Sequence, residues 1–161
     1  MNPGEDTAFP PPEHDHNRCR TDLMRQAEVR CEARHVRLTD QRRRVFAIVA
    51  AEHKAIGAYD ILAQLAQRGR PPAPVSVYRA LEFLVENGLV HRVESLNAYV
   101  ACARNDVRHR AQFLVCKKCR TVAEIHSPLI EDAIAAGAQA AGFVPHAQIV
   151  EVAGLCRICA E

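Results

Sequence analysis

The spacing of apolar residues predicts helices through the first half of the chain. From Thr21 apolar side chains recur every three or four residues, and the pattern breaks near 35–38. Thr39 is placed to cap the next helix, since its hydroxyl can accept a hydrogen bond from a backbone N–H of the first turn. Gly69 ends a third helix, and Gly88 is placed to end a fourth in a left-handed conformation. We expect helices from Thr21, from Thr39 through Ile48, from Ala58 to about Gly69, and from Val75 to Asn87.

The fourth predicted helix has an apolar face and a polar face. Ser76 and Arg79 lie opposite the apolar side chains, with Tyr78 beside them. After this helix the period shifts to two, which is typical of a β-hairpin, here over 89–102 with a turn at 95–97. Helices followed by such a hairpin predict a winged helix. The side chains expected to point inward from the fourth helix are Val77, Ala80, Leu81, Leu84 and Val85.

A second unit is predicted after a polar linker. Two short strands, a helix with Ser127 as its N-cap and a last strand form a small α+β module. The first residues of the chain have no periodicity and three adjacent prolines, and this predicts a disordered arm. We expect an α+β protein with an arm at 1–20, a winged-helix domain at 21–103, a hinge at 104–110 and a second domain at 111–161. In the second domain, strands are expected at 112–115, 121–125 and 148–152, and the helix at 128–141.

Four cysteines occur as two Cys-x-x-Cys pairs, Cys116 with Cys119 and Cys156 with Cys159. Two intervening residues let both sulfurs of a pair converge on one ion, and structural Zn²⁺ takes four thiolates tetrahedrally. A redox pair or a disulfide explains one of the two pairs, whereas a shared metal explains both. We therefore predict a structural zinc site that fastens together the two ends of the second domain.

The basic charge is concentrated in one segment. Residues 18–92 hold fourteen Lys and Arg against eight Asp and Glu, whereas residues 93–161 hold seven of each. This asymmetry indicates a nucleic-acid-binding half joined to a neutral half, although a solvated helix surface would also carry such charge.

The composition excludes several classes of protein. With 161 residues, 48% of them apolar, the chain can bury a core, and no apolar run approaches the roughly 18 residues of a membrane span. Seven cysteines, an odd number, suit a reducing compartment, so we expect a cytoplasmic protein without a membrane partner. No catalytic triad, phosphate-binding glycine loop or acid pair is present, so we expect neither an enzyme nor a small-molecule substrate.

Several motifs in order give the chain a family resemblance. Arg37-Leu38-Thr39-Asp40-Gln41-Arg42, Ala58-Tyr59-Asp60, Ser76-Val77-Tyr78-Arg79-Ala80-Leu81, Gly88-Leu89-Val90 and the two cysteine pairs together resemble the ferric uptake regulator family of metal-sensing repressors. One departure is Asp40, where many relatives have proline, but Asp is acceptable in a first helical turn. The resemblance implies a winged-helix DNA-binding domain followed by a domain that forms a homodimer.

The resemblance is to zinc-sensing members of that family. Iron and peroxide sensors carry a His-rich run before the first cysteine pair, whereas here 104–109 contains His109 alone. Four residues match the regulatory zinc ligands of zinc-sensing members, and a thiolate favours zinc over iron. Two Zn²⁺ per protomer are thus expected, the second acting as corepressor for a palindromic operator in double-stranded DNA of zinc-uptake genes. These expected regulatory ligands are His91, Cys102, His109 and Glu124.

The predicted DNA contacts lie on the basic helices. Arg79 can bond the O6 and N7 atoms of guanine, while Tyr78 and Ser76 can reach phosphate or a thymine methyl group. The resemblance adds Tyr59, and Arg42 and Arg43 are expected to contact phosphates. Two alternatives stay open: an iron or peroxide sensor of the same family, and a zinc-ribbon interaction module that does not bind DNA.

Overall fold

The computed structural model describes residues 9, 15–67, 69, 71–102 and 111–160. Two compact units divide the chain, one containing residues 15–102 and the other residues 111–160. The predicted hinge, including His109, and most of the predicted arm lie outside the described residues. None of the helices within the described ranges is long and apolar enough to cross a membrane.

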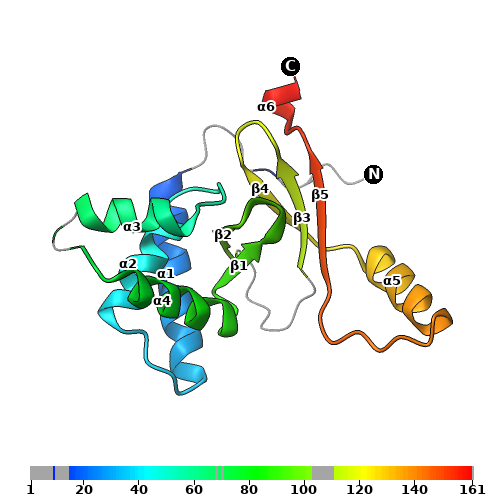
Figure 1. Ribbon diagram of the computed structural model, residues 1–161, viewed down its shortest axis with the longest axis horizontal. Coiled ribbons are helices and arrows are strands. Elements are labelled where there is room, and N and C mark those ends of the chain that lie inside the picture. The colour runs from blue at the N-terminus through cyan, green and yellow to red at the C-terminus, as the bar shows by residue number, and fades with distance from the viewer. Residues whose placement is uncertain (1–8, 10–14, 68, 70, 103–110, 161) are drawn as a thin grey trace. The chain divides into compact units, whose positions relative to one another are not determined.

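The first unit is a winged helix, as predicted (Figure 1). Four helices precede a two-stranded antiparallel hairpin in which Val90 pairs with Ala101 and Val93 with Ala98. A two-way backbone bridge between Ile56 and Tyr99, with both N···O distances at 2.9 Å, ties the chain before the third helix to the hairpin. The elements are α1 (His16–Ala33), α2 (Asp40–Val49), α3 (Ala58–Gln67), α4 (Pro74–Glu86), β1 (Val90–Val93), a 3₁₀ turn (Glu94–Leu96) and β2 (Ala98–Ala101).

The first helix begins at His16, earlier than the predicted start near Thr21. The Asp15 carboxylate accepts hydrogen bonds from the backbone N–H groups of Asn17 and Arg18, at 3.0 and 3.2 Å. Such a cap satisfies donors that have no partner inside the helix, so it can start a helix where the sequence has no apolar periodicity. The sequence prediction missed this start because it relied on periodicity.

The core of the winged helix is formed by the apolar faces of α1 to α4. Thr39 caps α2 as predicted, since its hydroxyl oxygen accepts from the Arg42 N–H. On α4 one inward assignment was wrong: Val85 is 38% exposed, and Phe83 is buried instead. Each large apolar side chain that folding buries contributes about 1.5–3 kcal/mol. The largest buried side chains here are Phe46, Ile61, Leu65, Leu81 and Leu84.

The second unit is a three-stranded sheet with two helices (Figure 1). The strand order is β4-β3-β5, with β3 antiparallel to β4 and parallel to β5. Ser127 occupies the predicted N-cap of the longer helix, but its side chain makes no capping hydrogen bond. The elements are β3 (Ala111–Cys116), β4 (Val122–Ile125), α5 (Pro128–Ala140), β5 (Ile149–Gly154) and α6 (Arg157–Ala160).

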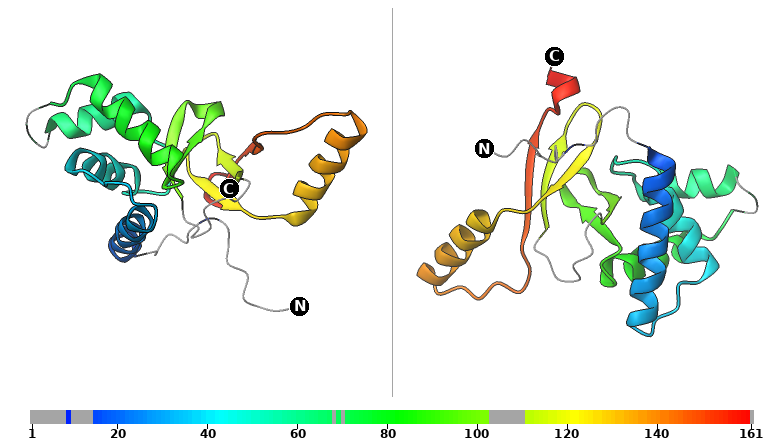
Figure 2. Two further views of the ribbon diagram at one scale, coloured as in Figure 1. Left: turned by 90° about the horizontal axis from the view of Figure 1, so that it is seen from below. Right: turned by 180° about the vertical axis from the view of Figure 1, so that it is seen from behind.

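Helix α5 is not packed into the unit's own core. None of its residues is buried within one chain, and both views of Figure 2 show the helix standing away from β3 and β5. Leu129 on this helix is 80% exposed. Further large apolar side chains are exposed after the helix and along β5: Phe143, Val144, Ile149 and Val152.

Candidate metal centres and DNA interface

The four paired cysteines come together at one end of the three-stranded sheet. In the parallel register Cys116, the last residue of β3, lies opposite Gly154, the last residue of β5. The Lys117 N–H donates to the Gly154 carbonyl at 2.9 Å, and Cys156 follows two residues later. The pairing of β3 with β5 therefore brings together two cysteine pairs that are forty residues apart in the sequence.

The sulfur positions fit one tetrahedral zinc ion. All four Sγ atoms lie within 4.8 Å of one another, and Cys119 Sγ lies 3.7 Å from Cys156 Sγ. With Zn–S bonds of 2.3 Å, the edge of a tetrahedron of sulfurs is about 3.8 Å. The chemistry of the donor set also fits, because four thiolates form the closed, structural type of zinc site.

Hydrogen bonds prepare part of this cluster for a metal. Backbone N–H groups, first that of Cys119, lower the pKa of Cys116 from 9.0 to about 6. Burial opposes ionisation of Cys119, but hydrogen bonds with the side chain and backbone of Thr121 lower its pKa overall. Burial and the neighbouring sulfurs of Cys156 and Cys119 raise the pKa of Cys159 to about 12. Without metal the cluster thus favours a thiolate at Cys116 and a thiol at Cys159.

Two of the predicted regulatory ligands are neighbours on the wing of the first unit. His91 lies on β1 opposite Val100, and Cys102 follows β2, so both side chains project from the same face of the hairpin. A ring nitrogen of His91 and the sulfur of Cys102 lie within 4.8 Å of each other. Both can therefore reach one ion. Glu124 lies on β4 of the second unit, opposite Phe113, and His109 is outside the described residues.

The predicted base-reading residues lie on exposed parts of α3 and α4. Tyr59, in the first turn of α3, is 81% exposed, Tyr78 is 39% exposed, and Arg79 is exposed. Ser76 is half-buried, and its hydroxyl donates to the Ala73 carbonyl at 2.7 Å. Ser76 therefore helps to fix the first turn of α4, in addition to its predicted contact with DNA.

The two arginines expected to contact phosphates have partners within the first unit. The Arg42 guanidinium carbon lies 3.5 Å from the centroid of the Phe83 ring, and its Nη1 donates to the Arg37 carbonyl. Arg43 forms an ion pair with Glu28, and both side chains are partly exposed. Arg42 thus packs α2 against α4, while the Arg43 charge is partly compensated.

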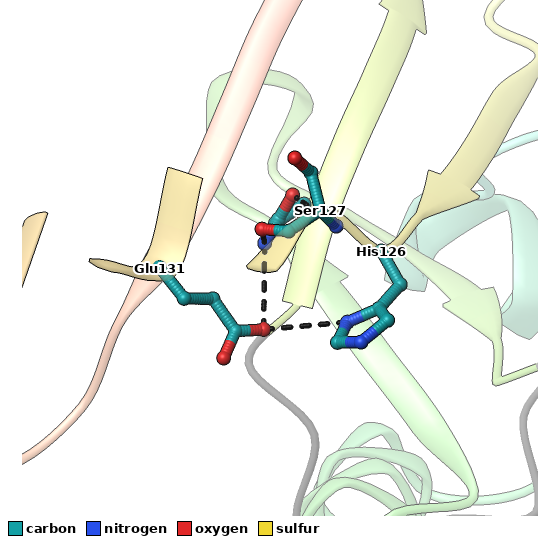
Figure 3. A network of polar contacts seen from close by, with 4 residues as sticks. His126, Ser127 and Glu131 are labelled. Carbon is teal, nitrogen blue, oxygen red and sulfur yellow. Dashed lines mark hydrogen bonds and ion pairs between the residues drawn. The ribbon is translucent and has the colours of Figure 1, made fainter. Parts of the chain in front are cut away.

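A polar network lies at the junction of β4 and α5 (Figure 3). The fully buried Gln112 amide donates to the Ser127 carbonyl at 3.1 Å and accepts from the Ser127 N–H at 3.2 Å. His126 Nδ1 lies 3.3 Å from a carboxylate oxygen of Glu131. The network ties Ser127, the N-cap residue of α5, to β3. Within the described residues His126 belongs to no group of three or more metal-binding side chains.

A comparison with known families covers most of the chain. The model of the ferric uptake regulator family matches residues 33–153. The chain belongs to this family. The winged helix, the small second unit and the cysteine cluster are therefore the family's fold, as the sequence motifs predicted.

Relatives of this regulator are named for zinc uptake. The zinc uptake regulation protein of Escherichia coli (strain K12) is 40% identical over 141 residues, which are 87% of this chain and 82% of the relative. A solved zinc uptake regulator, complexed with zinc and DNA, is 39% identical with a TM-score of 0.83, covering 88% of this chain and 95% of that one. The crystal structure of holo XcZur is 40% identical with a TM-score of 0.79, covering 86% and 97%.

Sequence reasoning missed several contacts that position the functional elements of this regulator. Arg42 was assigned to DNA alone because its partner Phe83 is forty-one residues away in the sequence. Gln112 was read only as part of a strand, although it is fully buried and bound to Ser127. The available signal was that Gln112 is a polar residue among the apolar residues of β3, since a buried polar side chain needs a hydrogen-bond partner.

Proposed function

We propose that this family member is a zinc-responsive transcriptional repressor for which Zn²⁺ is the corepressor. The observation that carries the proposal is the pairing of His91 and Cys102 on the wing of a DNA-binding fold. A thiolate beside an imidazole prefers zinc to the harder ferrous ion. The names of the relatives, which include a regulator bound to zinc and DNA, point to the same metal and partner.

The structural zinc of this proposal is held by Cys116, Cys119, Cys156 and Cys159. Support comes from the sulfur distances, which match a tetrahedral site, and from the lowered pKa of Cys116. Because the ion would join the ends of β3 and β5, its binding energy would stabilise the sheet. This site is expected to keep its ion bound under conditions in which the regulatory site exchanges its ion.

The regulatory zinc of this proposal is held by His91, Cys102, His109 and Glu124, which gives two ions per protomer. The resemblance to zinc-sensing relatives supplies this set, and the distance between His91 and Cys102 supports half of it. A zinc ion bound by all four residues of this proposed set would cross-link the wing and the strand that carries Glu124. Such a cross-link would limit the positions that the DNA-binding unit samples.

The protein is proposed to act as a homodimer on a palindromic operator. The exposed apolar side chains of α5 and β5 leave a surface that a second copy can cover. Two recognition helices related by two-fold symmetry reach successive major grooves when they are about 34 Å apart. Zinc would favour this spacing. The regulated genes are proposed to be those of zinc uptake, after the relatives' names.

The DNA contacts of this proposal centre on α4. Arg79 would read a guanine edge, with Tyr78, Ser76 and Tyr59 beside it, because most of these side chains are exposed. Arg42 and Arg43 would contribute to phosphate binding from α2. Such a DNA-binding role places the protein in the cytoplasm and requires no enzymatic activity.

The proposal is tested by operator binding at buffered metal concentrations. DNA fragments selected from the source genome by the purified protein would be titrated with Zn²⁺ and, anaerobically, with Fe²⁺. We expect affinity to rise at a lower free concentration of Zn²⁺ than of Fe²⁺. Activation by Fe²⁺ at the lower concentration would favour the iron sensor, and binding to no duplex with either metal would favour a zinc-ribbon interaction module.

A further inference from the structure

At the C-terminal end of α4, arginine side chains bind two backbone carbonyls, that of Glu86 in the helix and that of Gly88 just after it. Gly88 adopts a left-handed conformation with φ of 67°, and its N–H donates to the Val85 carbonyl at 3.0 Å. The Leu89 N–H donates to the Leu84 carbonyl at 2.9 Å. This is a Schellman motif, which does not use the carbonyl of Glu86.

Arg30 of α1 and Arg34, the residue that follows this helix, bind these two carbonyls. Arg30 Nη1 donates to the Gly88 carbonyl at 2.7 Å, and Arg34 Nη1 approaches the Glu86 carbonyl at 3.4 Å. The contact of Arg30 is partly buried, while that of Arg34 is exposed. A cation at a helix C-terminus also interacts favourably with the helix dipole, and partial burial reduces screening by solvent. Arg30 therefore makes the stronger of the two contacts.

The peptide held by Arg30 leads directly into the zinc-binding wing. The next carbonyl, that of Leu89, accepts a hydrogen bond from the Cys102 N–H at 3.0 Å. His91 follows two residues later on β1. The segment from Gly88 to His91 is thus fixed at one end by Arg30 and at the other by the two regulatory ligands of the wing.

We propose that Arg30 is a positioning residue that couples the regulatory zinc to the recognition helix. The inference rests on the proposed function. Zinc at His91 and Cys102 would fix the start of the wing. Arg30 would hold the junction between α4 and β1 against α1, so that a fixed wing also fixes the end of α4. Without Arg30 the wing could be ordered by zinc while the end of α4 keeps its freedom to move.

A phosphate contact is the competing role for a basic residue in this segment, and the two roles differ in their signature. An arginine that binds phosphate strengthens DNA binding with or without zinc and adds about one unit to the salt slope. An arginine that couples zinc to α4 changes mainly the ratio of operator affinity with zinc to operator affinity without zinc. The ratio of operator affinity with zinc to that without zinc therefore distinguishes them.

The test compares Arg30→Met, Arg30→Lys and a matched control, Arg25→Met. Methionine keeps an apolar stem that can pack as the arginine stem does, and lysine retains one charged donor. Arg25 lies on the same helix, is 75% exposed and pairs only with Asp22 among the contacts described, so its substitution changes net charge equally. We expect Arg30→Met to lower the affinity ratio by about five- to tenfold, Arg30→Lys to restore part of it, and Arg25→Met to match the parent.

A second measurement follows the junction itself in the full-length dimer. Hydrogen exchange of the backbone N–H groups of residues 87–89 should slow when zinc is added to the parent, and slow much less in Arg30→Met. If Arg30→Met does not fold, Arg30→Lys serves for both measurements, with an intermediate ratio and an intermediate protection expected.

The inference is wrong if Arg30→Met keeps the parent's affinity ratio and exchange protection, or if affinity falls equally with and without zinc. These results are distinct from failure of the proposed function. That failure would appear in the parent, as an operator affinity and an exchange pattern at residues 87–89 that do not change with zinc, and it would overturn both.

Discussion

Replacement of Cys102 by serine tests the proposed regulatory site separately from the stability of the protein. Serine retains the backbone N–H that donates to the Leu89 carbonyl, so the end of the hairpin keeps its pairing. A hydroxyl is a far poorer zinc ligand than a thiolate, and the remaining ligands would hold zinc weakly. Cys102→Ser should therefore fold, dimerise and keep the structural zinc, yet fail to respond to zinc.

The expected losses of stability and of zinc response follow from the burial of Cys102 and from the coupling of zinc binding to operator affinity at each site. Cys102 is 3% exposed, so a serine hydroxyl at this position costs about 1–3 kcal/mol of unfolding free energy if it lacks a partner. A coupling of about 1–3 kcal/mol at each of two sites sums to about 2–6 kcal/mol, which corresponds to about thirtyfold to a few tens of thousands of fold in operator affinity. Loss of the zinc response should therefore be large compared with any loss of folded protein.

Cys31→Ser is the matched control for this experiment. Cys31 is also 3% exposed and also lies in the first unit, but it packs in the hydrophobic core. Both variants should lose similar stability in urea unfolding, and operator binding should respond to zinc only in Cys31→Ser. A Cys102→Ser protein that represses like the parent over the same range of free zinc would refute the assignment of Cys102.

The remaining predictions concern the structural zinc and the DNA surface. Cys116→Ser should cost folding and dimerisation, and sedimentation as a stable folded dimer would show that the site is dispensable. Protons compete with zinc for the thiolates, and without metal the pKa of Cys116 is about 6, so zinc held by the cluster should be released more readily to a chelator at pH 6 than at pH 8; equal release would argue against a thiolate cluster. Arg79→Ala should reduce discrimination by about 1–3 kcal/mol at one base, whereas Arg43→Ala should weaken all duplexes alike and lower the salt slope by about one unit. Equal effects of the two substitutions on operator and random DNA would contradict these roles.

Local signals allowed much of this fold to be predicted from the sequence. Thr39 and Gly88 act through their own backbone neighbourhood, so the start of α2 and the end of α4 were correct. The two-residue spacing within each cysteine pair is likewise a local property, and it predicted that the thiols would meet.

Features that depend on distant partners could not be predicted in this way. The parallel pairing of β3 with β5 is set by packing between segments far apart, and the spacing within each strand does not specify it. The contacts of Arg30 with Gly88 and of Arg42 with Phe83 are also long-range. Helix α1 was placed too late for a different reason, since a single capping residue, Asp15, outweighed the absence of apolar periodicity.

The proposed function requires two zinc ions per protomer with different tasks. Native mass spectrometry of the dimer during stepwise chelation, with operator binding followed in parallel, tests it most directly. We expect the first ion to leave from each protomer without loss of the folded dimer, and operator affinity to fall in step with its departure, while the second ion remains. A single ion per protomer, loss of both ions together, or operator binding that persists after the first ion has left would contradict the account.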